Sequence, residues 1–164
     1  MAGPRRLNLP LLPELSSNDD GARPRLESAR AQLGGPGETD ALAGERVALV
    51  SAAGERRVGV VLYANEREVD VWFEGSVVRR TLRGLIAALE PGEGSAALDA
   101  VVADVKVFAA LRDGDRVRWQ RSEGGVGEGK LIERCRYGAL VASDDGRILA
   151  VGFRRLWPAV TATD

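Results

Sequence analysis

Short stretches in which apolar and polar residues alternate make up most of the chain from residue 46 onward. In residues 69–74, two valines and Phe73 fall on one side of the pattern, while Asp70 and Trp72 fall on the other. A period of two is typical of a β-strand with one buried face. The pattern predicts strands at 46–50, 58–63, 69–74, 77–82, 116–120, 129–135, 138–143 and 147–152.

Two segments space their apolar residues as a helix does. Residues 24–33 begin with a proline, place three apolar residues on one face and are followed by a glycine, which predicts a short helix. Residues 95–104 predict a second helix, because apolar residues follow Leu98 at i+3, i+4 and i+7. The pattern at 105–110 fits either a helix or an extended strand, and 85–89 predicts a short helical turn.

The first set of strands recurs as the second. Gly44-Glu-Arg-Val47 returns as Gly114-Asp-Arg-Val117, an offset of 70 residues. A residue inserted near the turn at 144–146 is expected to change the offset to 71, which matches Leu85 with Leu156. A repeat with a fixed period determines the architecture, so we expect two units of one design.

The chain is therefore expected to be mostly β and to consist of two tandem small β-barrels. Four short antiparallel strands do not make a stable open sheet, so each set should curl into a barrel. The proline, glycine and polar content of the first 22 residues predicts disorder, although five leucines there could instead form a docking motif. The expected segments are a disordered arm at 1–40 with a helix at 24–33, a first barrel at 43–90, a helical connector at 91–110 and a second barrel at 111–158.

Three short motifs resemble the Src-homology-3-type barrels of the Tudor and KOW-motif kind. Each repeat opens with Gly-Glu/Asp-Arg-Val, continues through a Gly-(four residues)-Gly loop, and the first repeat adds Val71-Trp-Phe-Glu-Gly75. The resemblance covers about 95 of the 164 residues in two copies. It implies a binding module for peptides, modified side chains or nucleic acid.

The residues that most catalysis requires are scarce. The sequence contains no histidine, which removes the commonest general base, the usual nucleophile pairs and most zinc sites. Cys135 is the single cysteine; it lies in a predicted strand and is expected to be a buried structural residue. We therefore expect no enzyme, no cofactor and no metal. One cysteine also excludes an intramolecular disulfide and favours the cytoplasm.

Residues 124–131 imitate a phosphate-binding loop. They read Gly-Gly-Val-Gly-Glu-Gly-Lys-Leu, but Leu131 stands where a serine or threonine would hold magnesium. The first repeat has the same pair of glycines, Gly54 and Gly59, without the lysine. The loop is therefore expected to be part of the barrel architecture.

The partner of such a module is expected to be a protein or peptide. Trp72 is the leading candidate contact, because alternation turns it outward and its counterpart in the second repeat is only an alanine. The alternatives are that the other barrel or the central helix covers it. A cage for a methylated cation needs several facing rings, and none is clearly placed beside Trp72. The candidate partner contacts are Trp72, Asp70, Glu74, Tyr63 and Tyr137.

Nucleic acid is the alternative partner. The whole chain has a net charge of −1, but residues 111–158 carry ten basic and seven acidic residues. That excess makes the second unit mildly basic, as phosphate binding requires. The candidate contacts are Arg112, Arg116, Arg118, Arg121, Arg134 and Arg136.

No membrane segment or secretory signal is expected. No apolar run approaches the ~20 residues that a membrane helix needs, and prolines interrupt the leucines near the start of the chain. The sequence thus favours a cytoplasmic, non-enzymatic protein–protein adaptor or regulatory factor of unknown oligomeric state.

Overall fold

The chain divides into two compact units. The computed structural model describes residues 5–6, 15–16, 22–75, 77–94, 96–121 and 123–159. Unit 1 consists of Met1–Asn8 and Thr39–Ala109, and unit 2 of Leu9–Glu38 and Ala110–Asp164. Most of residues 1–22, for which the composition predicts disorder, lie outside the described residues.

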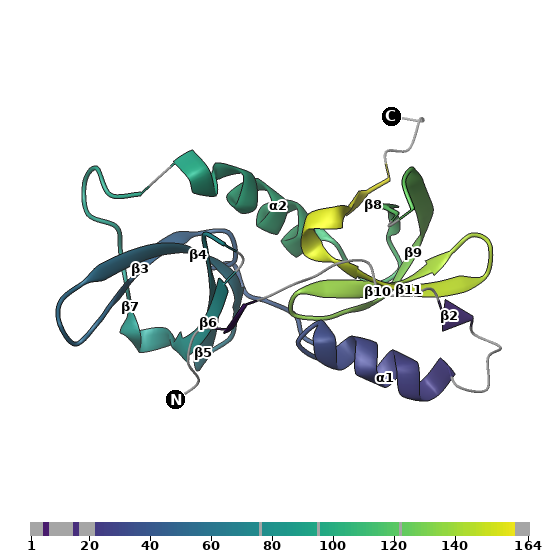
Figure 1. Ribbon diagram of the computed structural model, residues 1–164, viewed down its shortest axis with the longest axis horizontal. Coiled ribbons are helices and arrows are strands. Elements are labelled where there is room, and N and C mark those ends of the chain that lie inside the picture. Colours follow the sequence, from purple (N-terminus) through teal and green to yellow (C-terminus); the bar gives the residue numbers. More distant parts are fainter. Residues whose placement is uncertain are drawn as a thin grey trace. The chain divides into compact units, whose positions relative to one another are not determined.

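Unit 1 contains an antiparallel sheet in which consecutive strands are neighbours (Figure 1). A single 3-10 turn, η1, follows the fourth strand, and the short fifth strand then returns to pair with the first. The order is β6-β5-β4-β3-β7, and the two-residue strand β1 pairs with the free edge of β6. The elements are β1 (Arg5–Arg6), β3 (Arg46–Val50), β4 (Arg56–Ala64), β5 (Glu68–Phe73), β6 (Val77–Leu82), η1 (Arg83–Leu85) and β7 (Ile86–Ala87).

Unit 2 repeats this arrangement. Its strands follow the order β12-β8-β9-β10-β11, and β2 pairs with the free edge of β11. A 3-10 turn, η3, again lies between the fourth strand and the short fifth strand. The elements are β2 (Leu15–Ser16), β8 (Arg116–Gln120), β9 (Val126–Arg134), β10 (Gly138–Ser143), β11 (Arg147–Gly152), η3 (Phe153–Arg155) and β12 (Leu156–Pro158).

The repeat extends to individual backbone hydrogen bonds. Gly44 N–H donates to the carbonyl of Val61 at 2.8 Å, and Gly114 N–H donates to that of Leu131 at 2.7 Å. The register shift of β4 against β5 comes just after Val61, and that of β9 against β10 comes just after Leu131. The two units therefore share one backbone design.

The predicted change of offset to 71 is wrong. Leu49 pairs with Ile86 in unit 1, and Trp119 pairs with Leu156 in unit 2, so the offset remains 70 to the last strand. The hairpin turns after β5 and β10 have the same length, and no residue is inserted between them. A match based on apolar character misaligned the last strands, because the equivalent of Leu149 is the polar Arg79.

All eight predicted strands are present, and the mostly β prediction in two units is confirmed. β4 and β9 begin earlier than predicted, and the fifth strands β7 and β12 were not expected. These strands have only two and three residues, so no alternation could reveal them. In both sheets the outer strands of the five are not hydrogen-bonded to each other, so the pairing gives two open five-stranded sheets.

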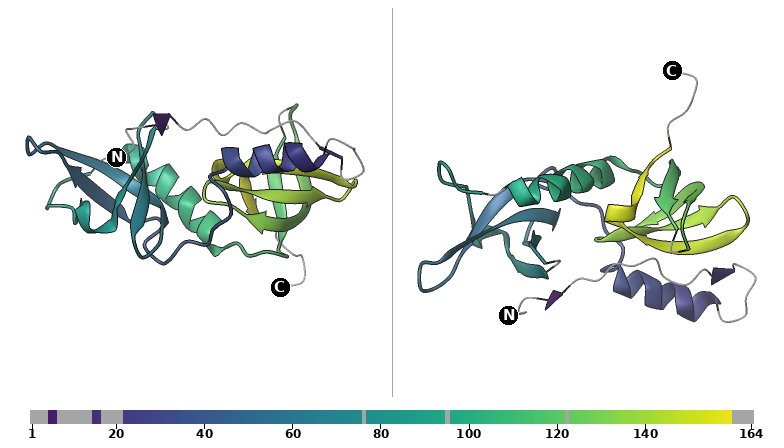
Figure 2. Two further views of the ribbon diagram at one scale, coloured as in Figure 1. Left: turned by 90° about the horizontal axis from the view of Figure 1, so that it is seen from below. Right: turned by 45° about the horizontal axis from the view of Figure 1, so that its top comes forward.

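Both predicted helices form. α1 (Ala22–Gln32) belongs to unit 2, where Ala29 and Leu33 pack with Cys135, Leu140 and Ala150. The segment left open at 105–110 is helical: η2 (Ala96–Leu98) leads into α2 (Asp99–Ala110), the green helix of Figure 2.

The sheet of unit 1 is buried on both faces. Val47, Leu49, Val61, Ala64, Val69, Val71 and Phe73 form the core on the inner face. On the outer face Arg46, Val60, Trp72 and Val78 form one row across β3, β4, β5 and β6. Arg46, at one end of this row, is hydrogen-bonded to Asp99 at the start of α2.

Alternation assigned Trp72 to the correct, outer face of the sheet. That face is covered within the chain, because Trp72 is only 5% exposed, which favours cover by the protein itself over a partner contact. Strand alternation identifies the two faces of a sheet and does not show what a distant helix covers.

We expect Trp72→Ala to lower the free energy of unfolding by about 3–5 kcal/mol, because it removes a packed aromatic side chain. Urea denaturation followed by circular dichroism measures the change. Leu82→Ala is the control, since Leu82 is 63% exposed and its truncation should have little effect. A loss below about 1 kcal/mol for Trp72→Ala would contradict the burial.

Gly129→Ala should be destabilising by about 2 kcal/mol or more, because of backbone crowding. A Cβ at Gly129 would lie 2.0 Å from the carbonyl oxygen of Ala142, and one at the equivalent Gly59 would lie 2.7 Å from that of Trp72. Gly84→Ala is a matched control, since nothing lies within 4 Å of its added Cβ. Equal melting temperatures for the two variants would refute the close approach.

Candidate functional site

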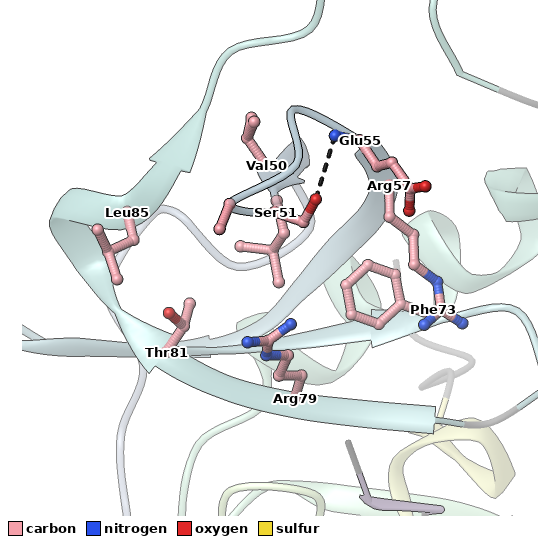
Figure 3. A pocket seen from close by; sticks show the side chains of 10 residues that line it. Val50, Ser51, Glu55, Arg57, Phe73, Arg79, Thr81 and Leu85 are labelled. Carbon is pink, nitrogen blue, oxygen red and sulfur yellow. Dashed lines mark hydrogen bonds between the residues drawn. The ribbon is translucent and has the colours of Figure 1, made fainter. Parts of the chain in front are cut away.

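A cavity of about 520 Å³ opens in unit 1 on the inner side of its sheet (Figure 3). Side chains from β3, β4, β5, β6 and η1 surround it, together with the turn between β3 and β4. The lining residues are Leu49, Val50, Ser51, Ala52, Glu55, Arg57, Phe73, Arg79, Thr81 and Leu85. We call this cavity the unit-1 pocket.

The base of the unit-1 pocket is apolar and continuous with the core. Leu49 is 9% exposed and Phe73 is 1% exposed, and both belong to the inner-face cluster. At the rim, Val50 and Leu85 are 46% and 57% exposed. Large apolar side chains that remain accessible beside a cavity are typical of a binding surface.

Two arginines face the same space from opposite strands. The guanidinium of Arg57 lies 4.3 Å from the centroid of the Phe73 ring, a cation–π contact that holds it against the wall. Arg79 points into the pocket from β6 (Figure 3). Glu55 is the one acidic side chain in the lining, and its backbone N–H donates to the Ser51 hydroxyl at 3.1 Å.

The equivalent space in unit 2 is filled. At the constant offset of 70, Leu49 corresponds to Trp119 and Arg57 corresponds to Gly127. Trp119 is 1% exposed, and a Cβ on Gly127 would lie 2.4 Å from its indole ring. The glycine thus provides the room that the tryptophan occupies, whereas unit 1 has a smaller side chain and leaves the space open.

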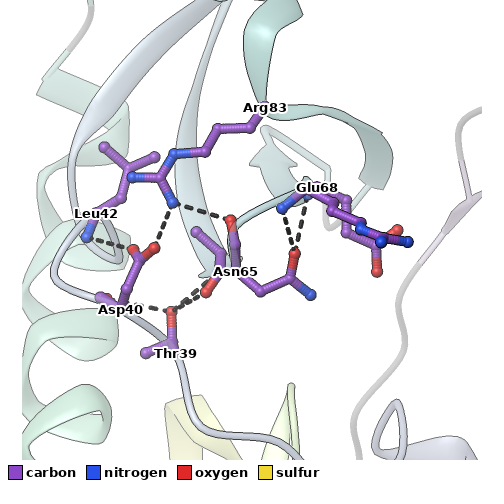
Figure 4. Close-up of polar contacts among 8 residues, drawn as sticks. Thr39, Asp40, Leu42, Asn65, Glu68 and Arg83 are labelled. Atoms are coloured by element: carbon purple, nitrogen blue, oxygen red, sulfur yellow. Dashed lines mark hydrogen bonds and ion pairs between the residues drawn. The ribbon is translucent and has the colours of Figure 1, made fainter.

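A second hollow in unit 1, of about 700 Å³, is lined by Asp40 and Arg83 among others. Two of its polar side chains, Arg83 and Asp40, bind each other and belong to a network with neighbouring residues (Figure 4). Arg83 pairs with Asp40 and also donates to the Asn65 carbonyl at 2.9 Å, while Thr39 accepts from Ala64 N–H at 2.9 Å. This network fixes the loop before β3 to the turn before β5, so we assign it a structural role.

The predicted partner contacts do not form one exposed site. Trp72, Tyr63 and Asp70 are buried, and Asp70 is fully covered and paired with Arg80, whose Nε donates to Oδ1 at 2.8 Å. Only Glu74 is exposed, on the turn after β5.

Tyr137 belongs to unit 2 and is buried there, 4% exposed. A Cβ on Gly34 would lie 2.7 Å from its ring, which shows how closely the ring packs on the end of α1. The expectation that it is available to a partner is therefore wrong. An aromatic residue after a strand gave no indication that the distant helix at 22–32 would cover it.

Several of the six predicted nucleic-acid contacts are already paired. Arg116 binds both carboxylate oxygens of Asp144, at 2.8 and 2.7 Å. This pairing lowers the pKa of the Asp144 carboxyl and raises the pKa of Arg116. The guanidinium of Arg118 lies 3.6 Å from Glu128, and that of Arg121 lies 3.9 Å from Glu123.

The remaining three arginines lie near α1 and the start of β8. Arg134 is 9% exposed and donates from Nη1 to the Leu111 carbonyl at 2.6 Å, and burial lowers its pKa. Arg136 N–H donates to the Gly35 carbonyl, and Arg112 N–H donates to Asp115. The last two contacts are made by backbone amides and do not involve the guanidiniums of Arg112 and Arg136.

Cys135 has the environment of a structural cysteine. Its side chain is fully buried, and this burial raises the pKa of the thiol to about 12. A thiol with that pKa remains protonated at neutral pH and is a poor nucleophile.

Residues 124–131, which resemble a phosphate-binding loop in sequence, lie in the β8–β9 turn and in β9. Gly129 and Lys130 are inside β9, which is followed by β10, so the strand–loop–helix context of a nucleotide site is absent at this segment. Within the described ranges, no cluster of acidic, cysteine or histidine side chains could hold a metal ion. None of the described helices has the length and apolar composition needed to cross a membrane.

No protein-family model matches this sequence, and no curated protein is significantly similar to it.

Sequence reasoning missed Leu49, Arg57 and Arg79 as site residues. Leu49 fits an ordinary core position, and isolated arginines on strands suggest solvated faces. The available signal was the repeat itself, because the two units differ at 49/119 and 57/127 in a complementary way. A large side chain beside a glycine in one copy, with a smaller one beside an arginine in the other, indicates a filled and an open interior.

We expect the double variant Leu49→Trp/Arg57→Gly, hereafter the plugged variant, to fold with a stability within about 1.5 kcal/mol of the natural chain. The new indole should fill the pocket as Trp119 fills unit 2. Urea denaturation gives the stability, and acrylamide quenching reports the burial of the added tryptophan. Leu49→Trp alone is the control, since Arg57 should then keep the indole more accessible. A quenchable indole in the plugged variant would show that the spaces are not equivalent.

Proposed function

We propose that this chain is a non-enzymatic binding module made of two small barrels of Src-homology-3 type, similar to those of Tudor and KOW-motif proteins. The strand order supports this proposal: a four-stranded meander is followed by a 3-10 turn and a fifth strand that pairs with the first. The inner-face core in unit 1 is the interior that such a barrel would enclose.

The observation that carries the proposal is the difference between the two units. Unit 1 has an open pocket of about 520 Å³, and unit 2 has Trp119 at the equivalent position. A cavity with an apolar base and a few polar groups is the usual form of a ligand site. Unit 1 is therefore the recognition unit and unit 2 is a structural copy, so the module acts as an adaptor or regulatory factor for a protein or peptide.

The nucleic-acid alternative has weaker support. Phosphate binding needs free cationic side chains on one surface. In unit 2, Arg116, Arg118 and Arg121 each lie within 4 Å of a carboxylate. Catalysis is disfavoured by the missing histidine and by the buried thiol of Cys135.

Panning of phage-displayed random peptides on the full-length chain tests this function. We expect enrichment of peptides that bind the natural chain and do not bind the plugged variant, with affinities in the micromolar range typical of small recognition modules. Fluorescence polarisation with the synthetic peptides gives the dissociation constants.

Labelled single-stranded and duplex DNA provide the comparison. Binding of DNA that falls steeply with salt, by about one log unit per phosphate neutralised, together with no pocket-dependent peptide, would replace the proposal with the nucleic-acid alternative.

A further inference from the structure

The unit-1 pocket contains one arginine, Arg57, for which the described residues provide no ion-pair partner. Two adjacent arginines on β4 show the contrast. Arg56 donates to both carboxylate oxygens of Glu93, each at 2.8 Å, which lowers the pKa of that carboxyl to about 2. Arg57, one residue on and on the opposite face, forms no ion pair with any residue that the structure describes. Its charge is available to a ligand.

The position of Arg57 suits it to a planar anion. The cation–π contact with Phe73 places the guanidinium beside the ring, where its N–H groups are the donors that a ligand in the cavity would meet. This contact also restrains the side chain before a ligand arrives, which reduces the entropy lost on binding. Arg79 supplies a second guanidinium to the same cavity. Arginines held in this way favour a carboxylate, which can accept two parallel hydrogen bonds.

The apolar residues of the lining favour a ligand that has an apolar group beside its negative charge. Leu49 at the base, and Val50 and Leu85 at the rim, offer apolar surface beside the arginines. An aliphatic side chain next to the anion would cover this surface and remove it from water. The ligand class with both properties is a peptide in which an aspartate or glutamate neighbours an aliphatic residue.

Phosphate and nucleic acid fit this pocket less well. Glu55 lies at the rim and would repel a doubly charged phosphate more strongly than a carboxylate. Among the described lining residues Phe73 is the only ring, and it is 1% exposed and contacts Arg57, so none of these residues offers a ring for a nucleobase to stack on.

We infer that the unit-1 pocket binds an acidic–aliphatic peptide, with Arg57 and Arg79 pairing with the carboxylate and Leu49, Val50 and Leu85 contacting the aliphatic side chain. This inference rests on the proposed function, because it names the ligand of the same site.

The test uses four sets of short fluorescent peptides with random flanks and a fixed aliphatic–Z–aliphatic centre, in which Z is glutamate, glutamine, lysine or phosphoserine. Fluorescence polarisation measures their binding to the full-length chain. We expect the glutamate set to bind and the glutamine set to bind about tenfold more weakly or worse, because a charge-assisted hydrogen bond is lost. The plugged variant should bind none of them.

Arginine substitutions give the matching evidence on the protein side. Arg57→Gln and Arg79→Gln should each weaken binding of the glutamate set by about tenfold. Arg57→Lys and Arg79→Lys should recover part of the affinity, which excludes general misfolding as the cause. Arg67→Gln is the control, since Arg67 is exposed on the turn before β5, outside the pocket lining, and should leave affinity unchanged.

The two levels of the proposal fail differently. If glutamate and glutamine peptides bind equally well and the plugged variant binds neither, the carboxylate inference is wrong and the binding function stands. A phosphoserine set that binds more than tenfold tighter than the glutamate set would assign the pocket to phosphate instead. If no set binds and panning yields no pocket-dependent peptide, both the inference and the proposed function are refuted.

Discussion

The close approach of backbones at one missing side chain shapes both sheets. Gly59 and Gly129 occupy the same position in the second strand of each unit, where a Cβ would meet a carbonyl oxygen of the next strand at 2.7 and 2.0 Å. The missing side chain lets the second and third strands of each unit approach closely at this position, and in both units the fifth strand pairs with the first. In unit 1, side chains of β3, β4, β5 and β6 surround a single space.

The two units share one backbone design but differ in the side chains that fill the inner side of the sheet. In unit 2 the indole of Trp119 fills the space, but its Nε1 is buried without a hydrogen-bond partner in the described part of the chain, which costs free energy. Unit 1 lacks that indole and has instead an open cavity with two guanidiniums along its wall. Filling favours stability and an opening favours recognition, so a duplicated fold can assign the two tasks to different copies.

Much of the fold followed from the sequence, because its signals are local. Period-two alternation gave all eight long strands, and helical spacing gave α1 and α2. The failures concern contacts between distant segments: the covered face of Trp72, the helix over Tyr137, and the fifth strands that exist only through pairing. The pocket was missed for the same reason, since it forms only where three strands bring Leu49, Arg57 and Arg79 together. Comparison of the two repeats position by position held the missing information.

The sequence order of the elements has a consequence for how the chain folds. α1 belongs to unit 2, yet all of residues 39–109 lie between it and the strands that it packs against, so the larger segment of unit 1 is inserted within unit 2. During synthesis unit 1 can complete its sheet first. The apolar face of α1 stays unpacked until β9, β10 and β11 have been made. Closing so long a loop lowers the folding rate of unit 2 more than it lowers the stability of the folded unit. A single proteolytic cut between α1 and β3 would also leave unit 2 divided between two fragments, held together by the packing of α1 on the sheet, the pairing of β2 with β11 and the ion pair of Arg30 with Glu133.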